Sequence, residues 1–318
     1  MRLLAAPDKF RGTLTALQAA TAIAAGAQRA GWRAAELPLA DGGEGTLEVL
    51  GGANRRTTVT GPLGRPVDAA WRLEEDGTAL LEAAQACGLT LAGGPERNDP
   101  LRATSRGVGE LVAAAIAAGA LRVVVSVGGV ASTDGGAGAL EALPTPLPVP
   151  LEVACDVDAR FLDAADVYAP QKGATPEQVR ILGERLAQLD VPDLPGSGAA
   201  GGLAGGLAAV GARLVPGFDL VASRLGFDEK LAGADLVVTG EGRLDATSFT
   251  GKVVGRVLER AATAGVEPLV LAGEVAANSP IGAVSLVERY GPERAFAEPA
   301  GCLAKLVETA LAERRAGP

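Results

Sequence analysis

The sequence predicts an α/β protein of two domains, in which a mostly parallel sheet carries helices on both faces. Three observations lead to this prediction. Both ends of the chain alternate short apolar runs with helical periodicity, the order typical of parallel sheets. The middle adds a hairpin signal around the Asp-Gly pair at 76–77. A length of 318 residues, of which 48% are hydrophobic, allows two domains and a substantial core.

The first part of the chain predicts two β-loop-α units. Residues 3–6 form the first expected strand, and Thr13 is the expected N-cap of a helix that ends near Arg29. A second strand is expected over 34–39, and the acidic glycine loop 41–45 leads from it into a short helix. Consecutive units of this kind form a parallel sheet with both loops at one edge.

The pattern changes at the turn cluster 61–66 and returns to β-loop-α order near Ala234. The expected elements in between are strands at 69–73, 78–81, 122–127 and 151–157 and helices at 105–118 and 176–189. The end of the chain adds strands at 236–238 and 268–272, and helices at 252–264 and from about residue 302. We therefore expect a discontinuous, Rossmann-like three-layer domain at 1–59 and 230–318. A mixed α/β domain at 60–229 is inserted into it.

Histidine is absent from the sequence, and this absence excludes several classes of active site. Nucleophilic Ser-His-Asp and Cys-His systems, His-ligated zinc and imidazole proton shuttles all need that residue. Phosphoryl transfer is a large reaction class that can use carboxylates, Lys, Arg and backbone amides together with Mg²⁺.

The net charge of −9 argues against nucleic acid and anionic membranes as partners, because both bind basic surfaces. The longest apolar run, 111–121, is well short of the ~18 residues of a membrane span. The apolar run before Asp8 is too short for a signal peptide. The three cysteines lack CxxC spacing, as is typical of a reducing compartment. We expect a cytoplasmic protein and leave homo-oligomerisation open.

Acidic side chains follow the expected strands at five places along the chain: Asp8, Asp41 with Glu44, Asp134, Asp156 with Asp158, and Glu241 with Asp245. In open α/β sheets, ligands bind at the carboxyl ends of the strands. A loop carboxylate is usually a cap or a solvated charge. Carboxylates gathered at one site can hold Mg²⁺ and accept a proton from an attacking hydroxyl.

Two glycine-rich loops, 128–138 and 196–206, are candidate phosphate sites, because successive backbone amides without Cβ atoms can face an anion. The alternative for each loop is a tight packing turn. The Gly-Lys pair at 251–252 is not a P-loop, since Ala246 and Val253 break that pattern at both ends. The G-x-G-x-x-G match at 196–201 follows a proline-containing turn instead of a strand, so it is weak support for a dinucleotide site.

Several of these segments occur together in one known family. They are 6–13, 38–46, 59–64, 128–138, 155–157, 170–174, 196–202, 234–245 and 251–252. In these segments and in their order the chain resembles class I glycerate kinases along almost its whole length. The resemblance implies phosphorylation of D-glycerate with ATP and Mg²⁺, with 2-phosphoglycerate favoured over 3-phosphoglycerate as the product. It also implies a two-domain fold.

The resemblance, with the acidic and glycine-rich loops, leads to a set of expected site residues. We expect Asp41 to take the proton of the substrate hydroxyl, with Asp245 and Asp8 as rivals. Lys172 and Arg11 are expected to hold the substrate carboxylate or the transferring phosphoryl group. Asp134 and Glu241 are the expected Mg²⁺ ligands. The expected substrate and phosphate contacts are Lys9, Arg11, Gly42, Gly43, Glu44, Gly128, Gly129, Ser132, Gly135, Gly136, Gly198, Gly201, Arg243 and Lys252.

The chain departs from the family pattern at Val130, Thr133 and Ala159, and Thr247-Ser248 stands where the family usually has Gln-Thr. These departures keep a kinase for a related small hydroxy acid, such as tartronate or erythronate, as one alternative. The other alternative is a non-catalytic relative that binds a nucleotide or a sugar acid.

Overall fold

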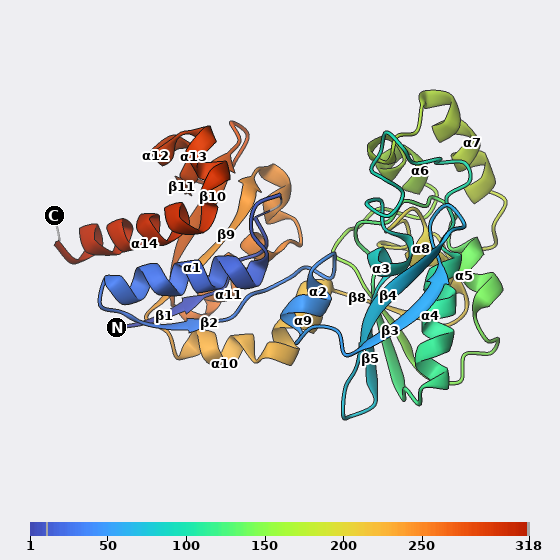
Figure 1. Cartoon of the computed structure of the whole chain (residues 1–318), viewed down its shortest axis with the longest axis horizontal. Coiled ribbons are helices and arrows are strands. Elements are labelled where there is room, and N and C mark those ends of the chain that lie inside the picture. The colour runs from blue at the N-terminus through green and yellow to red at the C-terminus, as the bar shows by residue number, and fades with distance from the viewer. Residues whose placement is uncertain (11, 317–318) are drawn as a thin grey trace. The chain divides into compact units, whose positions relative to one another are not determined.

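The computed structural model describes residues 1–10 and 12–316 and divides into two compact units (Figure 1). Unit 1 comprises Met1–Asp41 and Phe218–Pro318, and unit 2 comprises Gly42–Gly217. The chain therefore passes from one unit to the other at two places.

These passages lie at 41–42 and 217–218, whereas the domain boundaries expected from the sequence lie at 59/60 and 229/230. The turn cluster at 61–66 suggested the first of those boundaries. In the structure the short helix α2 (Thr46–Val49), which precedes that cluster, already packs against strand β5 (Thr78–Glu82) of unit 2. A turn cluster in the sequence marks a reversal of the chain and need not coincide with the boundary of a packed unit.

Unit 1 is built on a five-stranded parallel sheet in the order β11-β10-β9-β1-β2. The strands are β1 (Arg2–Ala5), β2 (Arg33–Glu36), β9 (Leu236–Leu244), β10 (Glu267–Val275) and β11 (Val284–Ser285). Because all pairs are parallel, the loops that follow β2, β1 and β9 leave the sheet at the same edge.

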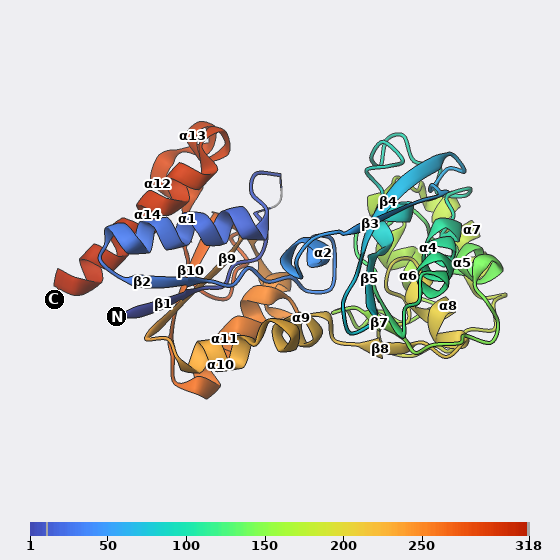
Figure 2. The same ribbon diagram turned by 60° about the horizontal axis from the view of Figure 1, so that its bottom comes forward.

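Helices cover both faces of this sheet (Figures 1 and 2). One face carries α1 (Ala16–Arg29), α12 (Leu286–Tyr290), α13 (Pro292–Ala297) and α14 (Pro299–Ala316), and the other carries α9 (Gly217–Leu225), α10 (Phe227–Ala232) and α11 (Val253–Ala264). Helices α1 and α14 approach closely, since a Cβ on Gly26 would lie 2.2 Å from the carbonyl oxygen of Ala304. The expected three-layer arrangement is confirmed for this sheet.

The predicted N-cap of α1 at Thr13 is wrong. The hydroxyl of Thr13 donates to the carbonyl of Phe10, within the turn before the helix. Thr15 is the N-cap and forms a capping box with Gln18. The glutamine three residues after Thr15 distinguishes the two threonines in the sequence, because a capping box needs Glu or Gln at that spacing.

Unit 2 contains a six-stranded mixed sheet in the order β3-β4-β5-β6-β7-β8. Its strands are β3 (Arg55–Thr60), β4 (Pro66–Leu73), β5 (Thr78–Glu82), β6 (Arg122–Ser126), β7 (Leu151–Ala154) and β8 (Arg213–Val215). The first three strands pair antiparallel and the last four pair parallel. The hairpin predicted around the Asp-Gly pair is confirmed as the β4–β5 connection, where Gly77 has a φ of +80°.

The helices of unit 2 are α2, α3 (Ala83–Cys87), α4 (Arg106–Ala117), α5 (Ala137–Ala142), α6 (Ala164–Tyr168), α7 (Pro176–Leu186) and α8 (Leu203–Ala209), with the 3-10 turn η1 at Pro170–Lys172. Helices α6 and α7 share a small apolar core around Phe161, Leu182 and Leu186. The main core of the unit lies between the sheet and helices α3, α4, α5 and α8.

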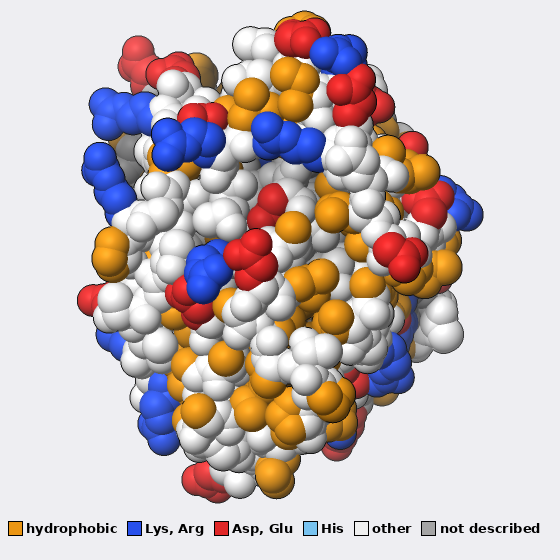
Figure 3. Space-filling model, turned by 90° about the vertical axis from the view of Figure 1, so that its right-hand side faces the viewer, with side chains coloured by type: hydrophobic (Ala, Val, Ile, Leu, Met, Phe, Trp, Pro, Cys, Tyr) orange, Lys and Arg blue, Asp and Glu red, His pale blue; other side chains and the backbone are white. Residues whose placement is uncertain are grey.

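Within the described residues, every helix is too short or too polar to cross a membrane. On the face drawn in Figure 3, acidic and basic side chains are interspersed around a central area with many apolar ones.

Candidate functional site

The carboxyl ends of three neighbouring strands in unit 1 carry a cluster of acidic side chains. Asp8 follows β1, Asp41 follows β2, and Glu241 lies near the end of β9. The pairing of β1 with β9 continues beyond β1, because the amide of Asp8 donates to the carbonyl of Gly240 at 2.9 Å. The three acids are therefore held at one sheet edge, the usual place for a ligand in such a sheet.

Electrostatics within this acidic cluster makes Asp8 a suitable proton acceptor. Burial and the carboxylate of Asp41 raise the pKa of Asp8 to about 7, although the Lys9 ammonium opposes the shift. Burial also raises the pKa of Glu241. A carboxyl group with a pKa close to the working pH can both accept and release a proton, as general-base catalysis requires.

The Oε1 atom of Glu241 is buried and has no hydrogen-bond partner among the described residues. Leaving a buried carboxylate oxygen unpaired is costly, so this atom indicates a partner that is not part of the chain. A substrate hydroxyl or a hard cation such as Mg²⁺ fits a carboxylate oxygen. The described residues contain no group of three or more side chains arranged to hold a metal. A metal here would therefore share its coordination shell with a bound ligand and water, as Mg²⁺ commonly does.

Asp245 is engaged in the loop that follows β9. It is the N-cap of the 3-10 turn η2 (Ala246–Phe249), and its Oδ1 accepts from the amide of Thr247 at 2.8 Å and from the hydroxyl at 2.6 Å. These hydrogen bonds lower the pKa of Asp245. A carboxylate with a lowered pKa is a weak proton acceptor, so the geometry favours Asp8 over Asp245 as a base.

Three of the expected cations belong to the same region of unit 1. Lys252 donates from Nζ to the hydroxyl of Thr247 at 2.9 Å, and Arg243 lies on β9 near Asp245, whose pKa it helps to lower. The amide of Lys9 donates to the carboxylate of Asp8 at 2.7 Å. Positive charge beside the acidic cluster allows an anionic ligand to bind there. Arg11 lies outside the described residues.

In unit 2 the glycine loop 42–45 is anchored by Glu82, a residue that the sequence analysis did not single out. Glu82 ends β5, is 4% exposed, and accepts at Oε1 from the amides of Gly45 at 2.9 Å and Leu47 at 2.7 Å. In the sequence Glu82 is an acid that follows an apolar strand, as Glu241 also does. Glu82 belongs to the predicted hairpin, however, and a hairpin strand does not by itself indicate a ligand site.

The glycine loop 42–45 lies against the expected contacts Gly128 and Gly129. A Cβ on Gly128 would lie only 2.7 Å from the Cα of Gly43. A Cβ on Gly129 would lie 3.6 Å from Oε2 of Glu44. The fold thus brings Gly43 and Glu44 against Gly128 and Gly129, with Gly42 next to Gly43 in the chain, and a binding role for these residues stays a prediction.

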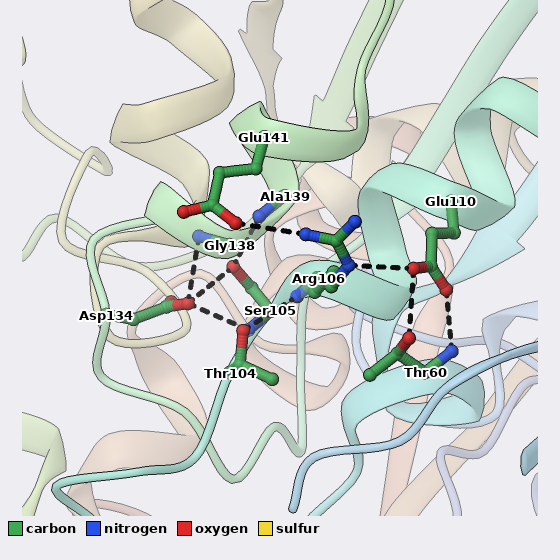
Figure 4. Close-up of polar contacts among 9 residues, drawn as sticks. All are labelled: Thr60, Thr104, Ser105, Arg106, Glu110, Asp134, Gly138, Ala139 and Glu141. Atoms are coloured by element: carbon green, nitrogen blue, oxygen red, sulfur yellow. Dashed lines mark hydrogen bonds and ion pairs between the residues drawn. The ribbon is translucent and has the colours of Figure 1, made fainter. Parts of the chain in front are cut away.

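Asp134 is the centre of a hydrogen-bond network between the starts of α4 and α5 (Figure 4). Its carboxylate accepts from the amide and the hydroxyl of Ser105, each at 2.8 Å, and from the amides of Gly136 and Gly138, each at 3.2 Å. The Ser105 hydroxyl also accepts from the amide of Ala139 at 3.0 Å. These contacts give Asp134 the task of anchoring two helices. A metal role for Asp134 remains a prediction.

The two glycine-rich loops of unit 2 pack against each other. A Cβ on Gly201 would lie 2.4 Å from the carbonyl oxygen of Ser132, and a Cβ on Gly206 would lie 2.3 Å from that of Gly135. The amide of Gly135 donates to the carbonyl of Gly201 at 3.1 Å, and the amide of Gly198 donates to the carbonyl of Ala159 at 2.9 Å. Close packing therefore accounts for these glycines, and phosphate binding by Gly135, Gly136, Gly198 and Gly201 stays a prediction.

Lys172 lies behind these loops with an exposure of 4%. Its Nζ donates to the carbonyl of Ser132 and to the hydroxyl of Thr133. Burial lowers the pKa of Lys172 to about 8. The hydrogen bond between Lys172 and Ser132 thus links η1 to the 128–138 loop. Both side chains are buried.

Comparisons with known proteins agree with one another. The family model described as "Glycerate kinase family" matches residues 3–148 and 144–284. The chain is 45% identical over 302 residues to an uncharacterized protein of Mycobacterium bovis, covering 86% of this chain and 79% of the relative. It is 36% identical over 305 residues to the Glycerate 2-kinase of Escherichia coli K12, covering 80% of each. A crystal structure of a protein assigned as glycerate kinase 2 from Salmonella typhimurium LT2 matches with a TM-score of 0.81 and 34% identity, over 100% of this chain and 99% of that one.

Proposed function

Because the chain belongs to the glycerate kinase family, we propose that it transfers the γ-phosphoryl group of ATP to D-glycerate in the cytoplasm. The name of the E. coli relative, Glycerate 2-kinase, supports the 2-hydroxyl as the acceptor and 2-phosphoglycerate as the product. One observation carries the proposal for the chemistry. Three neighbouring strand ends place Asp8, Asp41 and Glu241 at one edge, and the pKa of Asp8 is raised to about 7 by burial and by Asp41.

Asp8 acts as the general base in this proposal. The 2-hydroxyl proton of glycerate passes to the Asp8 carboxylate as the hydroxyl oxygen bonds to the γ-phosphorus. The bond from the γ-phosphorus to the bridging oxygen breaks, and its electron pair leaves with ADP. Asp41, which the sequence favoured as the base, instead helps to hold the pKa of Asp8 near the working pH. General-base assistance of this kind contributes roughly 10²–10⁴ in rate.

A magnesium ion fits the oxygen donors of this acidic cluster. Glu241, with its unpaired Oε1, and Asp41 would hold it together with nucleotide phosphates and water. When bound, Mg²⁺ would neutralise charge on the phosphate oxygens during transfer. Lys9, Arg243 and Lys252 would bind the substrate carboxylate and the phosphate groups, which the acids alone would repel.

The proposal is tested by measuring ADP release from MgATP in a coupled assay, with D-glycerate, tartronate and erythronate as acceptors. We expect D-glycerate to give the highest kcat/KM, and chelation of the metal with EDTA to abolish turnover. A higher kcat/KM with tartronate or erythronate would identify a kinase for a related hydroxy acid. Ligand binding without ADP release from any acceptor would instead identify a non-catalytic relative and refute the proposal.

A further inference from the structure

A directed chain of hydrogen bonds follows β9 and ends at Lys252. Lys252 donates from Nζ to the Thr247 hydroxyl at 2.9 Å, and that hydroxyl donates to Oδ1 of Asp245 at 2.6 Å. A hydroxyl has a single proton but two lone pairs. Because Thr247 gives its proton to Asp245, its lone pairs are oriented toward the ammonium group. The order from Lys252 through Thr247 to Asp245 is therefore the only one that satisfies all three groups.

The Thr247 hydroxyl is not needed to hold the turn itself. The amide of Thr247 donates to Oδ1 of Asp245 at 2.8 Å, and the amide of Asp245 donates to the hydroxyl of Ser248 at 3.0 Å. The capping box of η2 pairs the Asp245 side chain with the amide of Ser248 and the Ser248 hydroxyl with the amide of Asp245, so it needs no help from the threonine side chain. Removing the hydroxyl would leave this frame in place and free only the ammonium of Lys252.

The position of Lys252 is unfavourable for its own helix. It is the N-cap of the 12-residue helix α11, where the helix dipole is positive and where Ser, Thr, Asp or Asn is preferred. The first turn that follows, Val-Val-Gly-Arg, contains no acid that would offset this charge. A cation at such a place indicates a purpose other than helix stability. Lys252 also opposes the upward pKa shift of Glu241, so its charge is felt by the acidic cluster.

We propose that Thr247 is a positioning residue that holds the Lys252 ammonium for contact with the γ-phosphoryl group during transfer. This inference rests on the proposed kinase function. Asp245 acts through Thr247 by orienting its hydroxyl, and it takes no proton from the substrate. Thr247 uses one of the three N–H donors of Lys252, and the other two can donate to phosphoryl oxygens.

The kinetic test uses Thr247→Val, which removes the hydroxyl at nearly constant volume, and Thr247→Ser, which restores it. We expect Thr247→Val to lower kcat by roughly 10–100-fold with the KM for D-glycerate within about threefold, because the lost contact forms in the transition state. Thr247→Ser should stay within about threefold of the wild type. Thr263→Val is the matched control, since Thr263 is exposed on α11 and its hydroxyl donates only to the helix backbone at Glu259.

A double-mutant cycle shows whether Thr247 acts through Lys252. In the background of Lys252→Met there is no ammonium to position, so adding Thr247→Val should change kcat by less than about twofold. Multiplicative losses in the double variant would overturn the proposal, as would a wild-type kcat in Thr247→Val.

A second measurement does not depend on activity. The chain has five lysines, so a ¹³C-lysine-labelled sample gives five Cε signals, and the signal missing from Lys252→Met belongs to Lys252. A side chain held in place should show two resolved Hε resonances in the wild type and in Thr247→Ser, which merge in Thr247→Val. Unchanged resonances in Thr247→Val would refute the positioning role. An inactive wild type with these expected spectra would refute the proposed function alone.

Discussion

Replacing Asp8 with Asn should make the protein more stable at alkaline pH and less active as a kinase. The fold raises the pKa of Asp8 from its ordinary value of 3.8 to about 7, chiefly by burial and by the neighbouring Asp41. A raised pKa means that the folded state disfavours the ionised carboxylate. The contribution of Asp8 to stability is therefore fully present below about pH 4 and is lost as the pH rises through about 7. Asn cannot ionise, so the variant avoids this loss.

The size of the effect follows from the shift. About 3 pKa units at ~1.4 kcal/mol each give an upper limit of about 4 kcal/mol at pH 8. Asp8 is only partly buried, so readjustment of Lys9 and of nearby water reduces the expected gain to about 1–2 kcal/mol. This corresponds to a rise in Tm of roughly 2–6 °C at pH 8. At pH 4 both proteins carry a neutral side chain, and the gain should largely vanish.

Thermal unfolding at pH 4 and pH 8 with EDTA, together with steady-state kinetics at pH 8 with Mg²⁺, measures both effects. We expect Asp8→Asn to lower kcat by about 100-fold or more, as for loss of a general base. Asp190→Asn is the control, because Asp190 is exposed in the connection after α7. Equal Tm values of Asp8→Asn and the wild type at pH 8, or near-normal turnover of the variant, would refute the assignment of Asp8.

Three further changes test other parts of the site. In EDTA, the loss of wild-type stability that comes from ionisation of Asp8 should extend to about pH 7, and Asp41→Asn should end it at lower pH by removing a charge that raises the pKa of Asp8; an unmoved plot of Tm against pH would contradict the coupling. Glu82→Ala should lower the free energy of unfolding by about 1–3 kcal/mol in urea, whereas Glu82→Gln keeps an acceptor and should lose less; equal losses would exclude this anchoring role. Gly206→Ala should destabilise by about 1–3 kcal/mol because its Cβ would lie 2.3 Å from the Gly135 carbonyl oxygen, and wild-type stability would show that the loops can separate.

The sequence was sufficient for the α/β class because that prediction depends on local patterns. Apolar runs such as 236–238, followed by helical spacing, indicate parallel strands wherever they occur. The same logic placed Asp8, Asp41 and Glu241 at strand ends, and the strand order then brought these ends together at one edge.

The tasks of individual side chains depend on partners that are remote in the sequence. The sequence does not show that Asp134 anchors two helices, because its partner Ser105 lies 29 residues away. Glu82 drew no attention because its partners, Gly45 and Leu47, lie 37 and 35 residues away. The sequence of the two glycine-rich loops does not show that Gly201 makes room for the carbonyl of Ser132 and Gly206 for the carbonyl of Gly135, because these contacts join segments about 70 residues apart. A sequence motif therefore identifies candidate site residues, whereas their hydrogen-bond partners become known only from the fold.

The most direct test of the central claim is the ³¹P spectrum of the product formed from MgATP and D-glycerate. Transfer to the 2-hydroxyl attaches phosphorus to a carbon with one hydrogen, so the proton-coupled resonance should be a doublet that grows in step with ADP. A triplet would indicate transfer to the CH₂ group and 3-phosphoglycerate, which would contradict the proposed product. The absence of any new phosphomonoester resonance would contradict the proposed kinase function itself.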